Sequence, residues 1–265
     1  MSRLVFAANW KMHHGPVAGR ALVRAVLARW RPREGRDLLF FPPAPSLAAV
    51  VEEAKGRRDV AVGVQNVHWE PKGAFTGETS ASIAAEAGAT WALVGHSERR
   101  HKFGETDEET GRKVVAAHKT GLAPMLCVGE LIEERRAGKT EEVVLRQLAA
   151  GLGGLDAAAT AGVVIAYEPV WAIGTGVNAT PADAAAVHRT IRAWLKDRTP
   201  PAARATILYG GSVSPANSAA LLAEEEIDGF LVGGASLEEE SWLSILGTER
   251  PRRREARGRG RETAT

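Results

Sequence analysis

The sequence contains a single cysteine, Cys127, among 265 residues. One cysteine excludes a disulfide within the chain and is consistent with a reducing compartment. Cys127 lies inside an apolar segment, where a cysteine usually packs in the core and does not act as a nucleophile. We therefore expect the fold to depend on core packing without covalent cross-links.

Long hydrophobic runs and targeting segments are also missing. No apolar run reaches the roughly 20 residues that a membrane-spanning helix needs. The first six residues, MSRLVF, lack the layout of a signal peptide. We expect a cytoplasmic protein with no membrane partner.

Motifs that would indicate a cofactor, a metal or a nucleophile fail on their context. Gly174-x-Gly176-x-x-Ala179 fits a relaxed dinucleotide pattern, but it does not directly follow a strand as that fingerprint requires. No Walker sequence occurs, and residues 210–214 fall one residue short of a nucleophile elbow. His13 and His14 are adjacent and would point apart, and no cluster has zinc-ligand spacing. We expect no cofactor and no metal.

The charge of the chain is small but unevenly distributed. The formal net charge is +2, whereas the segment from Arg250 onward carries seven arginines and two glutamates. Residues 1–249 therefore have a net charge of −3, and the whole chain has the 45% apolar content of an ordinary globular protein. We predict one domain over 1–249 and a disordered, Arg-rich tail over 250–265. Such a tail can bind nucleic acid, but a solvated extension is the simpler interpretation, and we do not expect a nucleic-acid partner.

Short apolar runs alternate with helical patterns along the chain. The runs are uniformly apolar, as in strands of a parallel sheet that is covered on both faces. Eight such pairs in about 250 residues favour a closed (β/α)8 barrel. An open doubly wound sheet is the main alternative, but it usually has a glycine-rich turn after its first strand. Strands are expected near residues 4–8, 38–41, 60–64, 91–94, 124–128, 163–167, 205–209 and 229–232, and helices over 16–30, over 181–195 and from Ser214-Pro215.

One long loop, residues 65–79, interrupts the alternation and carries Trp69 and Phe75. Long loops in compact domains are usually functional. Apolar rings on a protruding loop favour burial against another chain. The alternative is a loop that folds back on its own surface.

Polar residues and glycines gather at the predicted ends of strands, where barrel enzymes keep their active sites. Glu168 ends an apparent buried strand and precedes an apolar loop bounded by Pro169 and two glycines, Gly174 and Gly176. This layout suits a general base in a dry site with a hinged cover, since burial raises the pKa of a carboxylate. The other strand-end groups are Asn9 and Lys11, His96 to Glu98, Gly210 to Ser212, and Gly233 with Gly234.

These residue types together indicate a reaction. Glycine turns after the last two strands leave backbone N–H groups accessible, and helix starts at Pro215 and near Ser236 would add partial positive charge, so a phosphate is the natural ligand. A carboxylate, an imidazole and an ammonium suit proton abstraction next to a carbonyl. We expect isomerisation of a small phosphorylated carbonyl compound.

Five segments resemble the triosephosphate isomerase family. The likeness covers about residues 3–247 and excludes the tail. The segments are Asn9-Trp10-Lys11-Met12, residues 94–100 (VGHSERR), residues 166–176 (AYEPVWAIGTG), residues 209–213 (YGGSV) and residues 229–236 (GFLVGGAS).

The resemblance implies a TIM barrel that interconverts dihydroxyacetone phosphate and D-glyceraldehyde 3-phosphate in glycolysis and gluconeogenesis, without cofactor or metal. This family is itself the type example of the implied roles. Glu168 would be the base, His96 would polarise the carbonyl as a neutral imidazole, Lys11 would supply positive potential with Glu98 as its partner, and residues 169–178 would form a lid. The implied substrate-binding groups are Asn9, Lys11 and the backbone N–H groups of Gly174, Ser212, Gly233 and Gly234.

The resemblance also implies a homodimer through the 65–79 loop, with Thr76 near its tip. The family often has Gly and Asn where this chain has Ala8 and His13. Neither change removes a catalytic group, although His13 leaves details of the dimer contact open. Two other functions stay open at this stage: an isomerase of a four-carbon sugar phosphate, and a catalytically retired barrel whose tail binds nucleic acid.

Overall fold

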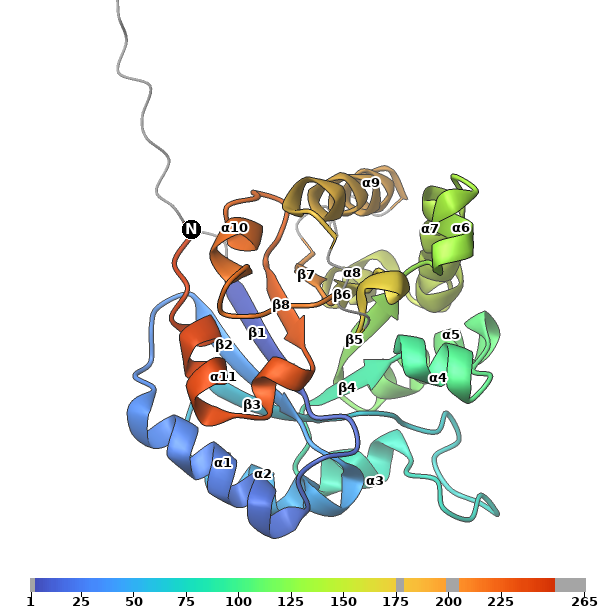
Figure 1. Cartoon of the computed structure of the whole chain (residues 1–265). Coiled ribbons are helices and arrows are strands. Elements are labelled where there is room, and N and C mark those ends of the chain that lie inside the picture. Colours follow the sequence, from blue (N-terminus) through green and yellow to red (C-terminus); the bar gives the residue numbers. More distant parts are fainter. Residues whose placement is uncertain (1–2, 175–178, 199–204, 251–265) are drawn as a thin grey trace, which may run out of the picture.

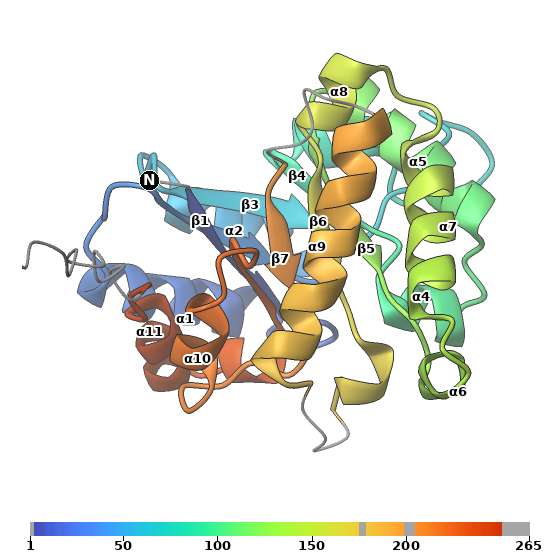
Figure 2. The ribbon, with the colours of Figure 1, turned by 90° about the horizontal axis from the view of Figure 1, so that it is seen from above.

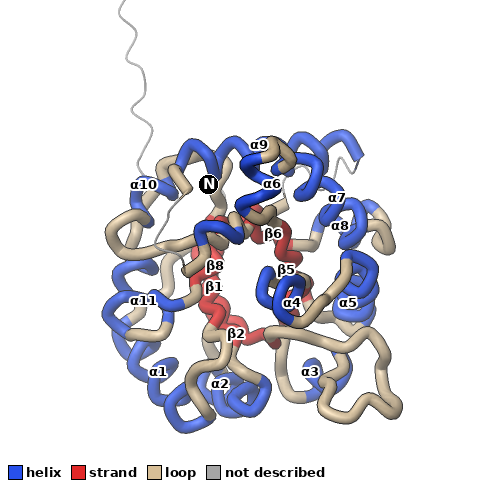
Figure 3. Tube along the Cα trace, turned by 45° about the vertical axis from the view of Figure 1, so that its right-hand side comes forward, coloured by secondary structure: helices blue, strands red, loops and turns tan. Residues whose placement is uncertain are grey.

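The computed structural model describes residues 3–174, 179–198 and 205–250, and in them eight parallel strands close into a barrel in sequence order. The helices form a ring around the strands (Figures 1, 2 and 3). The strands are β1 (Leu4–Asn9), β2 (Arg36–Phe41), β3 (Val60–Val64), β4 (Trp91–Val94), β5 (Ala123–Val128), β6 (Val164–Tyr167), β7 (Ile207–Tyr209) and β8 (Gly229–Val232). The helices are α1 (Pro16–Arg29), α2 (Leu47–Ala54), α3 (Ala81–Glu86), α4 (Ser97–Lys102), α5 (Asp107–Lys119), α6 (Ile132–Arg136), α7 (Thr140–Leu152), α8 (Ala157–Ala161), α9 (Pro181–Arg198), α10 (Ser218–Leu222) and α11 (Glu239–Leu246).

The predicted (β/α)8 barrel is confirmed, and the open-sheet alternative is wrong because β1 pairs with both β2 and β8. Most predicted strands lie within two residues of their observed bounds. The prediction that a helix begins at Ser214-Pro215 is wrong, because α10 begins only at Ser218. Asn217 caps the turn before it by accepting a hydrogen bond from the Ser214 N–H at 2.8 Å and donating one to the Ser212 carbonyl at 2.9 Å.

The helix expected to start near Ser236 is corrected in the same way. Gly234–Ser236 forms a single 3-10 turn, and α11 begins at Glu239. The Ser236 hydroxyl donates to the carbonyls of Val232 (3.0 Å) and Gly233 (2.7 Å), which holds the turn directly on the end of β8. A tight turn still directs its backbone N–H groups to one side, but the partial charge of a long helix is absent here.

The apolar core has two layers, which explains why the strands read as continuous apolar runs. In β1, Val5 and Ala7 belong to the cluster inside the barrel, whereas Leu4, Phe6 and Ala8 belong to the cluster between barrel and helices. Because successive side chains of a strand point to opposite faces, both faces must be apolar when both are buried. The barrel interior is filled by Val5, Ala7, Leu39, Phe41, Leu93, Met125, Cys127, Val164, Ala166, Leu208 and Leu231.

Cys127 lies in this interior layer, as expected for a packing cysteine. Burial, with a smaller contribution from the charge of Glu168, raises the pKa of the Cys127 thiol. A thiol without thiolate character is a poor nucleophile. Cys127 is therefore a core residue in this fold.

Barrel closure depends on one glycine. Gly229 starts β8 with a φ of 136°, and a Cβ there would lie 1.9 Å from the carbonyl oxygen of Val5. The two residues face each other in the β1–β8 pairing. Only glycine allows this backbone conformation and this close approach, so Gly229 lets the first and last strands join.

The described chain ends at Arg250, the first residue of the predicted tail. Its guanidinium donates to the carbonyl oxygens of Glu225 (3.1 Å) and Ile227. The rest of the predicted tail, 251–265, lies outside the described residues. In the described part of the chain, no helix has the length and apolarity to cross a membrane.

Candidate active site

The carboxyl ends of the strands bring together side chains that are far apart in the sequence. Glu168 follows β6, and His96 follows β4 after a single glycine. Their side chains meet with Glu168 Oε1 3.0 Å from His96 Nε2. Both are nearly inaccessible to solvent, with side-chain exposures of 2% and 7%. The predicted meeting of carboxylate and imidazole at one rim of the barrel is therefore observed.

The tautomer of His96 follows from its hydrogen bonds. Nδ1 accepts the backbone N–H of Glu98 at 3.2 Å, because His96 is the N-cap of α4. An acceptor nitrogen carries no proton, so the ring proton is on Nε2 and points at Glu168. The ring is thus prepared to donate one hydrogen bond from Nε2.

The second oxygen of Glu168 is held by α4. Oε2 accepts the backbone N–H of Ser97 at 2.8 Å. Ser97 was noted in the sequence only as a neighbour of His96, and its backbone contact has no sequence signal. Together, Ser97 and His96 supply one donor to each oxygen of the carboxylate.

The expectation that burial raises the pKa of Glu168 is wrong for this arrangement. Burial alone would raise it, but the hydrogen bond from His96, the Ser97 N–H and the charge of Lys11 together hold the Glu168 pKa below its ordinary value. Hydrogen bonds to the charged form of a carboxyl favour that form. Glu168 is therefore ionised at neutral pH and can accept a proton.

Lys11 lines the same cavity as His96 and has a constrained backbone conformation. Its φ is 52°, which is uncommon for a residue with a side chain. Three contacts fix it: its N–H donates to Asn9 Oδ1 (3.0 Å), its carbonyl accepts from Gln65 Nε2 (2.8 Å), and its Nζ donates to Glu98 Oε1 (2.9 Å). Such strain is typical of functional positions. The predicted Lys11–Glu98 pair is present, whereas Gln65 was missed.

Two of the predicted glycine turns lie against these side chains. A Cβ at Gly233 would be 3.0 Å from Lys11 Cε, and a Cβ at Gly210 would be 2.9 Å from Glu168 Cγ. Gly211 lies close to the start of the loop after β6, since its Cβ would be 3.0 Å from the Pro169 ring. The turns after β7 and β8 are therefore part of the same site as the base and the lysine.

The remaining predicted ligands are less closely connected. Ser212 follows the β7 turn, and its carbonyl accepts from Asn217. Gly234 opens the 3-10 turn after β8. Gly174 has a φ of 68° and is exposed. Of the predicted lid, 169–174 is described and 175–178 lies outside the described residues.

Glu130 is a buried carboxylate that the sequence interpretation missed. It lies two residues after β5 and accepts hydrogen bonds from the Tyr167 hydroxyl (3.1 Å) and Trp171 Nε1 (2.9 Å). Its carbonyl accepts the Val170 N–H at 3.1 Å. Glu130 thus fixes both the residue before Glu168 and the first turn of the predicted lid. Its position after an apolar strand is the same signal that identified Glu168.

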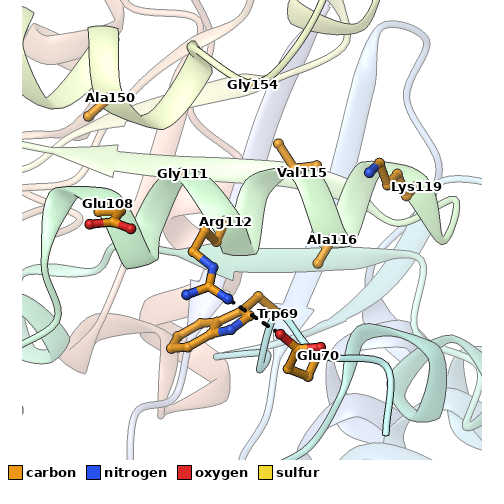
Figure 4. A pocket seen from close by; sticks show the side chains of 10 residues that line it. All are labelled: Trp69, Glu70, Glu108, Gly111, Arg112, Val115, Ala116, Lys119, Ala150 and Gly154. Atoms are coloured by element: carbon orange, nitrogen blue, oxygen red, sulfur yellow. Dashed lines mark hydrogen bonds and ion pairs between the residues drawn. The ribbon is translucent and has the colours of Figure 1, made fainter.

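Two cavities bear on the location of the site. The cavity at the carboxyl ends has a volume of about 260 Å³ and is lined by residues that include Asn9, Lys11 and His96. A larger one, about 590 Å³, lies on the outside of the barrel across α5 (Figure 4). That cavity lacks the paired acid, base and donor groups of the rim. The candidate active site therefore includes the smaller cavity, whose lining residue His96 contacts Glu168 at 3.0 Å.

The described His, Cys, Asp and Glu side chains are the groups that could hold a metal ion. Within 3–174, 179–198 and 205–250, no three His, Cys, Asp or Glu side chains gather in a way that could hold a metal ion. In the described part of the rim, His96 contacts two carboxylates, Glu168 Oε1 at 3.0 Å and Glu98 Oε2 at 3.7 Å. The site as described is composed of proton donors and acceptors.

Similarity to known proteins extends over nearly the whole chain. The family model described as triosephosphate isomerase matches residues 4–249. Proteins named triosephosphate isomerase are similar to it over nearly their full lengths. That of Herpetosiphon aurantiacus is 48% identical over 248 residues, covering 93% of this chain and 99% of the relative. Those of Symbiobacterium thermophilum and Moorella thermoacetica are 48% and 46% identical, covering 91% and 93% of this chain and 94% and 98% of the relatives.

The strand-end residues lie inside the matched region, and the relatives are matched almost end to end. The four-carbon isomerase and the retired barrel are accordingly not favoured. The barrel pairs a carboxylate with an imidazole at its carboxyl rim and has a lysine beside them. Together with similarity over nearly the whole chain, this shows that the chain belongs to the triosephosphate isomerase family.

Proposed function

We propose that this protein interconverts dihydroxyacetone phosphate and D-glyceraldehyde 3-phosphate by proton transfer through an enediolate. The observation that carries the proposal is the 3.0 Å contact between Glu168 Oε1 and His96 Nε2. An ionised acceptor and a neutral donor face each other without an intervening group. A substrate with a C–H bond next to a carbonyl can replace this contact with two others. Its C–H group would face Glu168, and its carbonyl oxygen would accept a hydrogen bond from His96 Nε2–H.

The reaction then follows from the two roles. Glu168 takes a proton from the carbon beside the carbonyl, and the C–H electrons form the carbon–carbon double bond of the enediolate. The carbonyl oxygen becomes an oxyanion and accepts the His96 Nε2–H. The remaining hydroxyl proton of the enediolate then moves to this oxygen. Glu168 returns its proton to the former carbonyl carbon while the neighbouring oxygen becomes the new carbonyl, which gives the isomer. No group outside Glu168, His96 and the substrate has to supply or remove electrons.

Lys11 and the glycine turns complete the proposal. The Lys11 ammonium, held against Gly233, would balance the charge of the phosphate and of the oxyanion. Asn9, whose amide oxygen already orients the Lys11 backbone, lines the same cavity. We assign the phosphate to the backbone N–H groups of Gly174, Ser212, Gly233 and Gly234, because two of the strand turns concerned lie against Lys11 and Pro169.

The direct test is the steady-state rate on glyceraldehyde 3-phosphate in buffer containing EDTA at neutral pH. We expect kcat/KM near the diffusional range of about 10⁸ M⁻¹ s⁻¹, for which this family is a known example. A parallel assay with four-carbon sugar phosphates provides the comparison. Preference for the longer sugar, or no turnover by folded protein, would contradict the proposal.

The cellular setting is part of the same proposal. A role in glycolysis and gluconeogenesis follows from the substrate pair, and the single buried cysteine is consistent with a cytoplasmic location. The interpretation of the Arg-rich tail as a solvated extension also stays a prediction, since 251–265 lies outside the described residues.

We also propose a homodimer in which the 65–79 loop contacts the partner. The loop extends away from the barrel beside α3 and α4 (Figure 1). Its residues 71–78, Thr76 included, are exposed. Two apolar side chains lining the active-site cavity, Met12 and Phe103, are also 93% and 70% exposed. Apolar surface of this kind beside a catalytic cavity favours cover by another chain.

The rings of the loop pack on side chains of the same chain, which was the alternative to burial against a partner. Trp69 is stacked beneath Arg112 of α5 at 4.3 Å, and Arg112 also pairs with Glu70 (Figure 4). Phe75 packs on His68, with ring centroids 4.3 Å apart, and is 43% exposed. The loop therefore partly folds back on itself. This packing stiffens its base and leaves the tip around Thr76 as the part that would reach a partner.

Removing residues 74–77 is expected to give a monomer with at least tenfold lower kcat/KM, because the tip would no longer cover the Met12 and Phe103 side of the cavity. Light scattering coupled to size exclusion would give the mass, and the isomerase assay the rate. Glu142→Arg, an exposed charge change on α7, is the control and should remain dimeric. A fully active monomer would show that the dimer contact is dispensable.

A further inference from the structure

Gln147 is a buried polar side chain that the proposed reaction does not use. It lies on α7, which packs on β5, and is 4% exposed. Its amide oxygen accepts the backbone N–H of Gly129 at 2.7 Å, and its amide nitrogen donates to the carbonyl of the same residue at 3.2 Å. One side chain thus holds both backbone polar groups of Gly129. Buried polar groups of this kind need their partners, since unpaired ones are costly.

Gly129 in turn supports the main chain of Glu168. A Cβ at Gly129 would lie 1.7 Å from the Glu168 carbonyl oxygen and 3.2 Å from its Cα. The preceding carbonyl, that of Val128, accepts the Glu168 N–H at 2.8 Å. The backbone at 128–129 is therefore the surface against which the backbone of Glu168 rests. Any displacement of the Gly129 peptide is transmitted to Glu168.

This support is most important while the reaction proceeds. In the free site, Ser97 and His96 hold the carboxylate oxygens. A substrate carbonyl that accepts the hydrogen bond from His96 Nε2–H replaces the contact between His96 and Glu168. The Ser97 N–H and the backbone anchor then remain as the restraints on the position of the carboxylate. A displacement of about 1 Å from productive geometry can cost on the order of 10²-fold in rate.

We propose that Gln147 is a positioning residue for the catalytic base, acting through the two hydrogen bonds that it makes to Gly129. It touches no substrate atom, and its effect is on the placement of Glu168. This inference rests on the proposed function, because it assumes that Glu168 transfers the proton. It predicts a loss in kcat with little change in KM.

The first experiment compares Gln147→Met and Gln147→Asn with the parent. Methionine keeps the length but removes both hydrogen bonds, and asparagine keeps the amide on a side chain too short to reach both groups. Either variant that folds should show kcat reduced about tenfold or more, with KM within about twofold. Val144→Ala on the same helix also removes buried packing and serves as control, with a lower melting temperature and near-normal kcat.

A double-mutant cycle with Glu168→Gln separates positioning from general damage. If Gln147 acts only by placing the base, its substitution changes the residual rate of Glu168→Gln by less than about twofold. The same tenfold loss in both backgrounds would overturn the inference, and so would a normal kcat in folded Gln147→Met. A normal rate in the single Glu168→Gln variant would instead contradict the proposed function, so the two failures are distinguishable.

Discussion

Replacing Glu168 with glutamine is expected to lower kcat by about 10²–10⁴-fold, the range found when a general base is lost. Glutamine keeps the size of the side chain but cannot accept a proton at neutral pH. It also has only one oxygen for two donors, the Ser97 N–H and His96 Nε2–H, and Nδ1 of His96 is already committed to the Glu98 N–H. The steady-state assay on glyceraldehyde 3-phosphate measures the effect, with circular dichroism to establish folding.

Two further variants sharpen this result. Glu168→Asp keeps the charge but withdraws the carboxylate by one methylene, so its rate should fall between those of the parent and of Glu168→Gln. Glu108→Gln makes the same chemical change at an exposed carboxylate on α5 and should leave the rate unchanged. If Glu168→Gln retained more than about a tenth of the parental kcat, Glu168 would not be the base.

The fold was predictable because each strand has its own apolar pattern, which can be recognised within a single segment of the sequence. Residues of β1 alternate between the barrel interior and the layer beneath the helices, so an uninterrupted apolar run such as 4–8 is typical of a strand buried on both faces. Turn chemistry was harder to predict. Pro215 indicated a helix start, but the Asn217 side chain caps a separate turn and delays α10 to Ser218.

The site was predictable to the extent that its residues follow strands. His96 and Glu168 are more than 70 residues apart, yet both were assigned to one rim because parallel strands of a barrel end on the same side. No comparable rule predicts which side chains of the surrounding helices contact the ends of the strands. Gln147 has the appearance of an ordinary polar residue of α7, and only the folded chain places its amide on Gly129.

The direction of the Glu168 pKa shift also needed the structure. Burial was correctly expected, and burial alone raises the pKa of a carboxyl. The opposing contributions come from the Ser97 N–H, from His96 and from Lys11, whose spatial relation to Glu168 is set by three different strands. A sequence indicates which groups are present, whereas the sign of a pKa shift depends on the distances between them.

Lys11 is the residue whose loss should have the second largest effect. Its positive φ is maintained by Asn9 and Gln65, its Nζ donates to Glu98, and its Cε lies close to Gly233. Burial tends to raise the pKa of Glu98, but the Lys11 ammonium outweighs it and keeps that pKa below its ordinary value. Glu98 therefore remains ionised at neutral pH and holds Lys11 Nζ at 2.9 Å within the site.

Lys11→Met should reduce kcat/KM by about 10²–10³-fold, the cost of removing one charge-stabilising donor from a transition state. The loss should appear in both KM and kcat, because the substrate phosphate is charged throughout whereas the oxyanion exists only along the reaction. Lys119→Met, at an exposed lysine on α5, is the matched control and should keep the parental rate. A kcat/KM within fivefold of the parent would assign Lys11 to the structural pairing with Glu98 alone. A loss confined to KM would limit its role to binding the phosphate and leave the oxyanion to His96.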